Sequence, residues 1–275
     1  MPDTTPADTA PAPIGMFASG AGGLAVLAEV RRLLPGEDVV YYADTAHFPY
    51  GPKPSADIRA RAEAITRELL ARGAKIIVVA CNTATSAAIA HLRAQFDVPF
   101  VGMEPALKPA AEGTLSGKIA LLVTPGTARG EKLAALIDRY GAEVSVTTIE
   151  APGLAERVEA GETDGAAIRD LLKRYLAPLR DSGADVLALG CTHYAFLRGA
   201  IEEVVGEGVS VIEPSAAVAR QVRRVVDARR LRSPRAAGGA VLYLCSGDEA
   251  AFAEIRERLT SIPARASTIS EEQHR

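Results

Sequence analysis

The segments RGAKIIVVACNT (72–83) and SGADVLALGCTH (182–193) repeat one pattern at two places in this chain. In each, a Gly-Ala pair precedes an apolar run that ends at a cysteine, Cys81 in the first segment and Cys191 in the second. A continuous apolar run of this length is typical of a strand that helices cover on both faces. The repeat therefore predicts two similar half-molecules, each presenting one thiol to a shared cleft. A reaction that needs equivalent groups on opposite faces of its substrate would use such a pair.

Short apolar runs alternate with helical runs along most of the chain, which indicates βαβ units of the α/β class. The predicted strands are Ile14–Phe17, Val39–Ala43, Ile76–Ala80, Phe100–Gly102, Ile119–Val123, Glu143–Thr148, Val186–Leu189, Val209–Ile212 and Val241–Cys245. Three of the predicted helices matter below: Gly126–Tyr140, Asp164–Ser182 and Tyr194–Val205.

We expect two similar doubly wound parallel-sheet domains, related by pseudo-twofold symmetry, with the active site in the cleft between them. Residues 1–13 are rich in Pro, Ala and Thr and are expected to form a disordered tail. The first domain should comprise residues 14–108 plus 220–265, and the second residues 109–219. The last strand and helix could pack on either domain, and we assign them to the first.

The composition excludes several classes of function. The chain has 275 residues, of which 48% are apolar and 24% are charged. Its net charge of −3 lacks the excess of positive charge that is typical of nucleic-acid-binding proteins. No apolar run is long enough to cross a membrane, and the N-terminus lacks the pattern of a signal peptide. Its three cysteines are widely spaced, which favours reduced thiols in the cytoplasm over a disulfide framework.

Both repeated cysteines are expected at the carboxyl end of a strand, directly before a helix. The free N–H groups and positive dipole end of a helix N-terminus favour a thiolate, so both sulfurs can act as nucleophiles or bases. Cys245 has no such partner and is expected to be an inert apolar side chain. The glycine-rich run GAGGL (20–24) is not a nucleotide fingerprint, and no Cys/His cluster has zinc spacing.

Three motifs then occur in order, FPYG (48–51), ACNTA (80–84) and GCTHY (190–194). With IGMFASGAGGL (14–24) and VGMEPALKPA (101–110), they resemble the aspartate/glutamate racemase family, and within it most the bacterial glutamate racemases. The resemblance runs from about Ile14 to Leu259. It implies a cytoplasmic isomerase that needs no cofactor and no metal. Such an enzyme interconverts L- and D-glutamate by a two-base mechanism and supplies D-glutamate for peptidoglycan. It also implies a homodimer whose partner is a small-molecule substrate, with no nucleic acid or membrane.

Carried over residue by residue, the resemblance makes Cys81 and Cys191 the two bases, with His193 assisting Cys191. Glu159 corresponds to the family's acidic helper beside the second cysteine, although Glu156 or Glu150 could fill that place. The positions that match the substrate-holding residues are Ser19, Pro49, Tyr50, Gly51, Asn82, Thr83 and Thr192.

The chain departs from the family at Ala18, where the first motif normally carries an aspartate that assists the first cysteine. The enzyme could still racemise glutamate with other support for Cys81. It could instead act on another amino acid such as aspartate, or be a degenerate paralogue that binds a dicarboxylic amino acid with little turnover. Asp44 is either a residue of the ligand loop or a turn residue.

Overall fold

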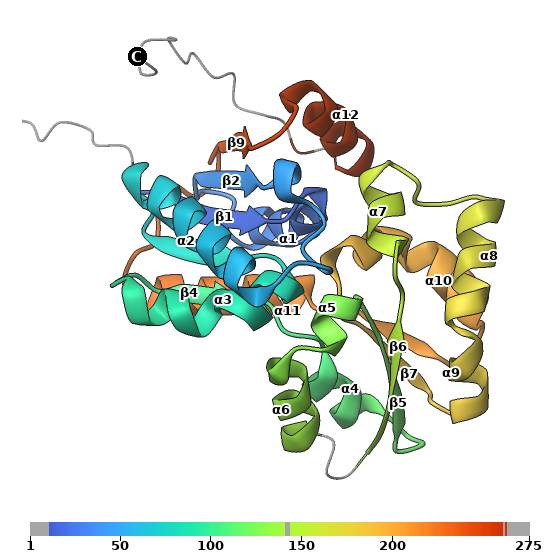
Figure 1. Cartoon of the computed structure of the whole chain (residues 1–275). Coiled ribbons are helices and arrows are strands. Elements are labelled where there is room, and N and C mark those ends of the chain that lie inside the picture. The colour runs from blue at the N-terminus through green and yellow to red at the C-terminus, as the bar shows by residue number, and fades with distance from the viewer. Residues whose placement is uncertain (1–10, 141–143, 261, 263–275) are drawn as a thin grey trace, which may run out of the picture.

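The computed structural model describes residues 11–140, 144–260 and 262. Within them, two parallel sheets stand side by side (Figure 1). Most of the expected tail 1–13 lies outside the described residues, and Pro11–Pro13 have no regular secondary structure. The strands are β1 (Ile14–Ala18), β2 (Val39–Ala43), β3 (Ile76–Val79), β4 (Phe100–Gly102), β5 (Lys118–Val123), β6 (Ser145–Glu150), β7 (Val186–Leu189), β8 (Ser210–Ile212) and β9 (Val241–Cys245). All of the predicted strands are therefore present.

The first sheet has the order β4-β3-β1-β2-β9, and every neighbouring pair is parallel. Its inner strands β1 and β3 are wholly buried, because helices cover both faces of the sheet. On one face α2 (Ser55–Ala71) packs against α3 (Asn82–Gln95). On the other, α1 (Leu24–Leu33) packs against α11 (Ser215–Ala228) (Figure 1). The last strand β9 pairs with β2.

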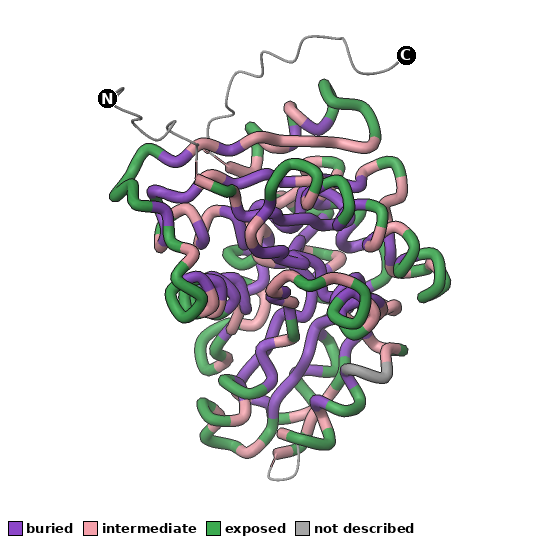
Figure 2. Tube along the Cα trace, turned by 90° about the vertical axis from the view of Figure 1, so that its left-hand side faces the viewer, coloured by how far each residue is buried: buried purple, intermediate pink, exposed green. Residues whose placement is uncertain are grey.

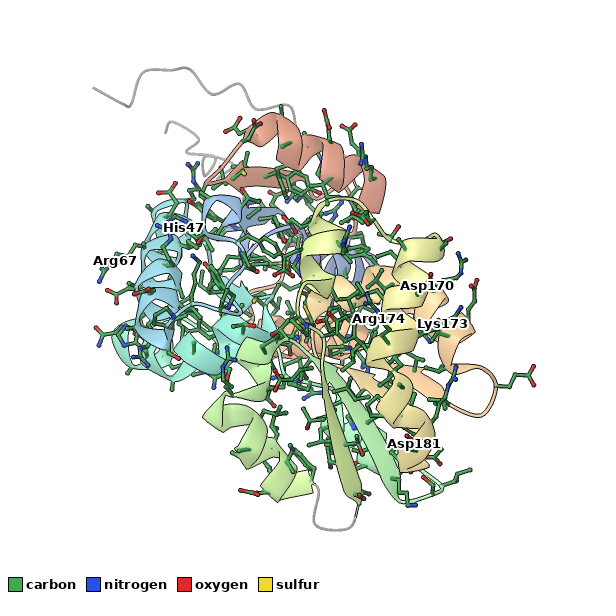
Figure 3. The ribbon with its side chains drawn as sticks, turned by 45° about the vertical axis from the view of Figure 1, so that its right-hand side comes forward. His47, Arg67, Asp170, Lys173, Arg174 and Asp181 are labelled. Carbon is green, nitrogen blue, oxygen red and sulfur yellow. The ribbon has the colours of Figure 1, made fainter. Side chains whose placement is uncertain are left out.

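The second sheet has the order β6-β5-β7-β8 and is again parallel throughout. Its central strands β5 and β7 are buried except at Lys118. Figure 2 shows buried segments in the interior of the molecule and exposed segments around them. The helices on its outside carry a charged face, as Asp170, Lys173, Arg174 and Asp181 show (Figure 3). The α/β class with two parallel sheets is confirmed.

The other helices are α4 (Leu107–Gly113), α5 (Pro125–Ala128), α6 (Glu131–Tyr140), α7 (Leu154–Glu159), α8 (Ala166–Tyr175), α9 (Ala177–Ser182), α10 (Arg198–Val205) and α12 (Glu249–Leu259), with 3-10 turns η1 (Ala21–Gly23), η2 (Thr45–His47) and η3 (Thr192–Leu197). Each of the three helices highlighted above differs from its prediction. Gly126–Tyr140 is divided into α5 and α6, and Asp164–Ser182 is divided at Leu176, close to Pro178. Tyr194–Val205 begins as the turn η3.

The proposed boundaries at residues 108 and 219 stay a prediction. Helix α11 straddles the second of them, and its apolar side chains from Val218 to Val226 join the core of the first sheet. In the described part of the chain, no helix is both long and apolar enough to span a membrane.

Candidate active site

The Cys81 thiol sits where strand β3 passes into helix α3, as the sequence predicts. Cys81 is the N-cap residue of α3, and its sulfur accepts a hydrogen bond from the N–H of Ala84 at 3.4 Å. The Ser19 hydroxyl lies 3.8 Å from the same sulfur. Burial raises the pKa of the Cys81 thiol, and the hydrogen bond from Ala84 opposes that rise only in part. The thiol form of Cys81 is therefore favoured at neutral pH.

Cys191 occupies the equivalent place after strand β7, as N-cap residue of the turn η3. Its backbone angles, φ −142° and ψ 136°, nearly repeat those of Cys81, φ −144° and ψ 125°. Cys191 has a different neighbour, however, because its sulfur lies 3.7 Å from Nδ1 of His193. The other ring nitrogen of His193 lies 2.8 Å from a carboxylate oxygen of Glu159. The two thiols are thus alike in backbone and unlike in chemical support.

The His193 side chain is 4% exposed, and burial alone would lower its pKa. Its hydrogen bonds to Cys191 and Glu159 outweigh burial and raise the pKa of His193 to about 10. A protonated imidazole beside Cys191 stabilises the thiolate of that residue. The ring of Phe48 also packs near this imidazole, with centroids 5.3 Å apart.

Glu159 joins the two halves of the molecule. Both of its carboxylate oxygens accept from the backbone N–H of Ala21, at 3.0 and 2.9 Å, in the turn that follows strand β1. Only glycine fits this contact: a Cβ on Gly20 would lie 2.4 Å from a Glu159 oxygen, and one on Gly22 would lie 2.4 Å from His193 Nδ1. The glycines of the run GAGGL therefore allow Glu159 and His193 of the second half to approach the backbone of the first half.

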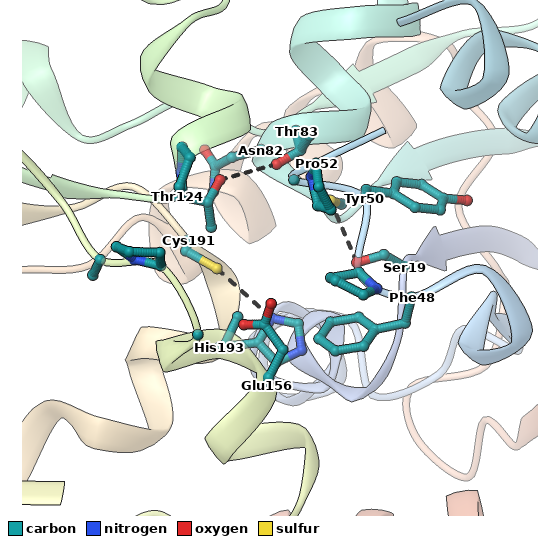
Figure 4. Close-up of a pocket in the computed structure, with 18 of the residues that line it drawn as sticks. Ser19, Phe48, Tyr50, Pro52, Asn82, Thr83, Thr124, Glu156, Cys191 and His193 are labelled. Carbon is teal, nitrogen blue, oxygen red and sulfur yellow. Dashed lines mark hydrogen bonds between the residues drawn. The ribbon is translucent and has the colours of Figure 1, made fainter. Parts of the chain in front are cut away.

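Both cysteines line one cavity of about 280 Å³ between the sheets (Figure 4). The predicted residues that line it with them are Ser19, Pro49, Tyr50, Gly51, Asn82, Thr83, Thr192 and His193. Glu159 does not line the cavity but stands behind His193. The structure therefore brings every predicted site residue together around one cleft.

Asn82 is the clearest sign of a ligand in this cavity. Its side chain is buried, yet neither its amide nitrogen nor its amide oxygen has a hydrogen-bond partner among the described residues. Such groups are costly unless something satisfies them. Next to it, the Thr83 hydroxyl lies 3.3 Å from the hydroxyls of both Thr124 and Thr127, which come from the second half. Polar groups from both halves thus meet at this end of the cavity.

The loop at Tyr50 is held from behind by Asp44, which is fully buried. The Tyr50 hydroxyl donates to Asp44 at 2.6 Å, and Arg61 donates to both oxygens of the same carboxylate. Burial would raise the pKa of Asp44, but these hydrogen bonds lower it below its usual value. Asp44 is therefore an anchor of the cavity loop as well as the residue before a turn.

Comparison with known proteins agrees with this geometry. The family model described as Asp/Glu/Hydantoin racemase matches residues 18–222. A glutamate racemase of Herpetosiphon aurantiacus is 49% identical over 247 residues, which is 90% of this chain and 97% of that protein. The chain belongs to the Asp/Glu/Hydantoin racemase family. Among solved structures, a Bacillus anthracis glutamate racemase has a TM-score of 0.82 at 29% identity, covering 92% of this chain and 97% of that one. Escherichia coli glutamate racemase, solved with L-glutamate and the activator UDP-MurNAc-ala, has a TM-score of 0.79 at 35% identity, covering 90% and 93%.

In this racemase-family protein, several cavity residues were missed from sequence: Phe48, Thr124, Arg129 and Pro152. Thr124 directly follows strand β5, so the rule that ligands bind at the carboxyl ends of parallel strands could have found it. Of the three candidate acidic helpers, only Glu159 contacts His193. Glu156 lines the cavity instead. Ala18 is buried under the site and does not line the cavity.

Proposed function

We propose that this protein is a cofactor-independent glutamate racemase whose two bases are Cys81 and Cys191. The observation that carries the proposal is the placement of two thiols, from equivalent positions of the two halves, on the wall of one small cavity. Inversion at the α-carbon needs a base on one face and an acid on the other, and a thiol can serve as either near neutral pH. D-Glutamate formed in the cytoplasm would serve peptidoglycan synthesis.

In one direction, the Cys191 thiolate removes the α-proton and Cys81, as a thiol, returns a proton to the opposite face. Each turnover breaks one C–H bond and forms another, so no electron acceptor is required. In the reverse direction Cys81 is the base. The Glu159–His193 pair favours the Cys191 thiolate, whereas Cys81 has the Ala84 N–H and Ser19. We therefore expect Cys191 to be the readier base and Cys81 the readier acid.

Recognition of the substrate is assigned to the polar groups of the cavity. The unpartnered amide of Asn82, the hydroxyls of Thr83 and Thr192, and the N–H groups at the start of α3 and η3 suit the two carboxylates. The relative from Escherichia coli, solved with L-glutamate, supports this choice of substrate. A homodimer in the cytoplasm remains our expectation from the resemblance.

The deciding experiment is incubation with L- and with D-glutamate in D₂O, without any added cofactor. We expect each enantiomer to yield the other, with deuterium at the α-carbon of the product. Calorimetric binding of glutamate with no α-exchange would identify a degenerate binding protein. Ala18, which replaces the aspartate of the family pattern, is the reason to consider that alternative. Turnover of aspartate in place of glutamate would identify a racemase for another amino acid.

A further inference from the structure

A second cavity, of about 400 Å³, adjoins the one that holds the two thiols. We call it the outer cavity, and it lies among α2, α3, α5 and the loop before α2. Gly51, Thr83 and Arg129 line both cavities and so form the boundary between them. The Thr83 hydroxyl and the glycine backbone make this boundary polar.

Three cationic side chains line the outer cavity: Lys53, Arg59 and Arg129. None of the three has a hydrogen-bond or ion-pair partner among the described side chains. Several other arginines of the described structure do form an ion pair with a carboxylate. Among the described residues that line the outer cavity, none is acidic. Its charge is therefore positive and uncompensated within the described structure.

Glu156, the one acidic residue among the described residues that line the thiol-bearing cavity, lies away from the outer cavity. Figure 4 shows Glu156 beside His193, whereas Thr83 and Thr124 lie at the far end. Thr83 also borders the outer cavity. We expect an anionic ligand to be drawn toward the Thr83 end, because Lys53, Arg59 and Arg129 lie on that side.

We propose that the outer cavity is a capture site for the carboxylates of the substrate, with Lys53, Arg59 and Arg129 as its ligands. This proposal rests on the proposed function, since the captured molecule is the glutamate that the two cysteines act on. The three cations raise the local concentration of the anionic amino acid beside the thiol-bearing cavity and so lower the KM for glutamate. Because these side chains are solvent-accessible, their effect should disappear when salt screens it.

The test compares two charge-matched variants at ionic strengths of about 0.01 M and about 1 M, where the Debye length is about 30 Å and about 3 Å. One carries Lys53→Gln, Arg59→Gln and Arg129→Gln. The control carries Arg223→Gln and Arg224→Gln on the exposed face of α11 and Arg229→Gln at its C-cap, on the other side of the first sheet. At low salt we expect the first variant to raise the KM for glutamate roughly three- to tenfold with a smaller change in kcat. At high salt the difference should vanish.

A double variant, Lys53→Gln with Arg59→Gln, tests the two cations that line only the outer cavity and leaves Arg129, which lines both cavities, unchanged. The double variant should still raise the KM for glutamate at low salt. The proposal is overturned if the double variant keeps the wild-type KM, if the triple variant does so, or if the α11 control raises KM equally. These outcomes are distinct from a failure of the proposed function, which would show as no racemisation by the wild-type protein.

Discussion

The Nε2 atom of His193 lies 2.8 Å from a carboxylate oxygen of Glu159, and the two side chains are only 4% and 16% exposed. The same carboxylate binds the Ala21 N–H in the other half of the molecule. Glu159 therefore helps Cys191 to keep the imidazole protonated and also ties the two halves together. It is the feature that most distinguishes the Cys191 side of the site from the Cys81 side.

Glu159→Gln should lower kcat roughly 10²-fold, because the imidazole would lose one of the two partners that keep it protonated. The dependence of stability on pH should change as well. Since the pKa of His193 is raised from 6.5 to about 10, its stabilisation is full below about pH 6.5 and is lost as pH rises toward 10. Wild-type Tm should fall across that window, and the variant should show a smaller fall, because Cys191 still raises the pKa of His193. Glu162→Gln, which removes only an exposed partner of Arg157, is the control and should alter neither quantity.

Cys81→Ser and Cys191→Ser should each lower net racemisation roughly 10²–10⁴-fold, since one face of the α-carbon loses its acid or base. Deuterium exchange followed by NMR should persist from only one enantiomer in each variant, and from opposite enantiomers in the two. Because burial raises the pKa of Cys81, exchange that depends on its thiolate should accelerate as pH rises above neutral. Cys245→Ser is the matched control. Equal exchange from both enantiomers in either active-site variant would refute the two-base assignment.

Gly126→Ala tests whether the two halves must close on each other. A Cβ at this position would lie 2.5 Å from the carbonyl oxygen of Gly51 and 2.8 Å from its Cα, so backbone would have to move. We expect kcat/KM to fall about tenfold or more, because a displacement of this size misplaces the catalytic groups. Gly199→Ala, in α10 with open space around the new methyl group, should leave kcat/KM unchanged and raise stability by up to about 1 kcal/mol. Normal activity in the Gly126 variant would show that closure is dispensable.

Ala18→Asp restores the side chain that the family pattern leads one to expect. If Cys81 lacks a helper, α-proton exchange that depends on Cys81 should rise by about tenfold or more. The new carboxyl group would be buried, because Ala18 is 1% exposed and its Cβ faces Gly23, so Tm should fall. Ala21→Ser, also buried and three residues further along the chain, controls for the added polar volume. An exchange rate that does not change would mean that Ser19 and the Ala84 N–H already support the thiol.

Much of the fold follows from local patterns. The continuous apolar runs predict the strands closely, with Val39–Ala43 and Val186–Leu189 matching at both ends. A strand buried on both faces leaves a signal within its own residues. The placement of Cys81 and Cys191 at strand ends follows for the same reason. Helix interruptions were harder to predict, as the break at Arg129 and Gly130 between α5 and α6 shows. Gly130 lies close to a neighbouring helix, since a Cβ on it would lie 2.4 Å from the Ser86 hydroxyl of α3.

The sequence by itself determined the strands, the paired thiols and the residues around them, because each of these features is encoded by a short run of neighbouring residues. Only the tertiary structure decided which carboxylate supports His193, because Glu150, Glu156 and Glu159 lie close together in the chain and only Glu159 reaches the imidazole. It also decided that Arg129 borders both cavities and that Glu159 binds the Ala21 N–H. Such contacts depend on how the two sheets face each other, and no local pattern of residues carries that information.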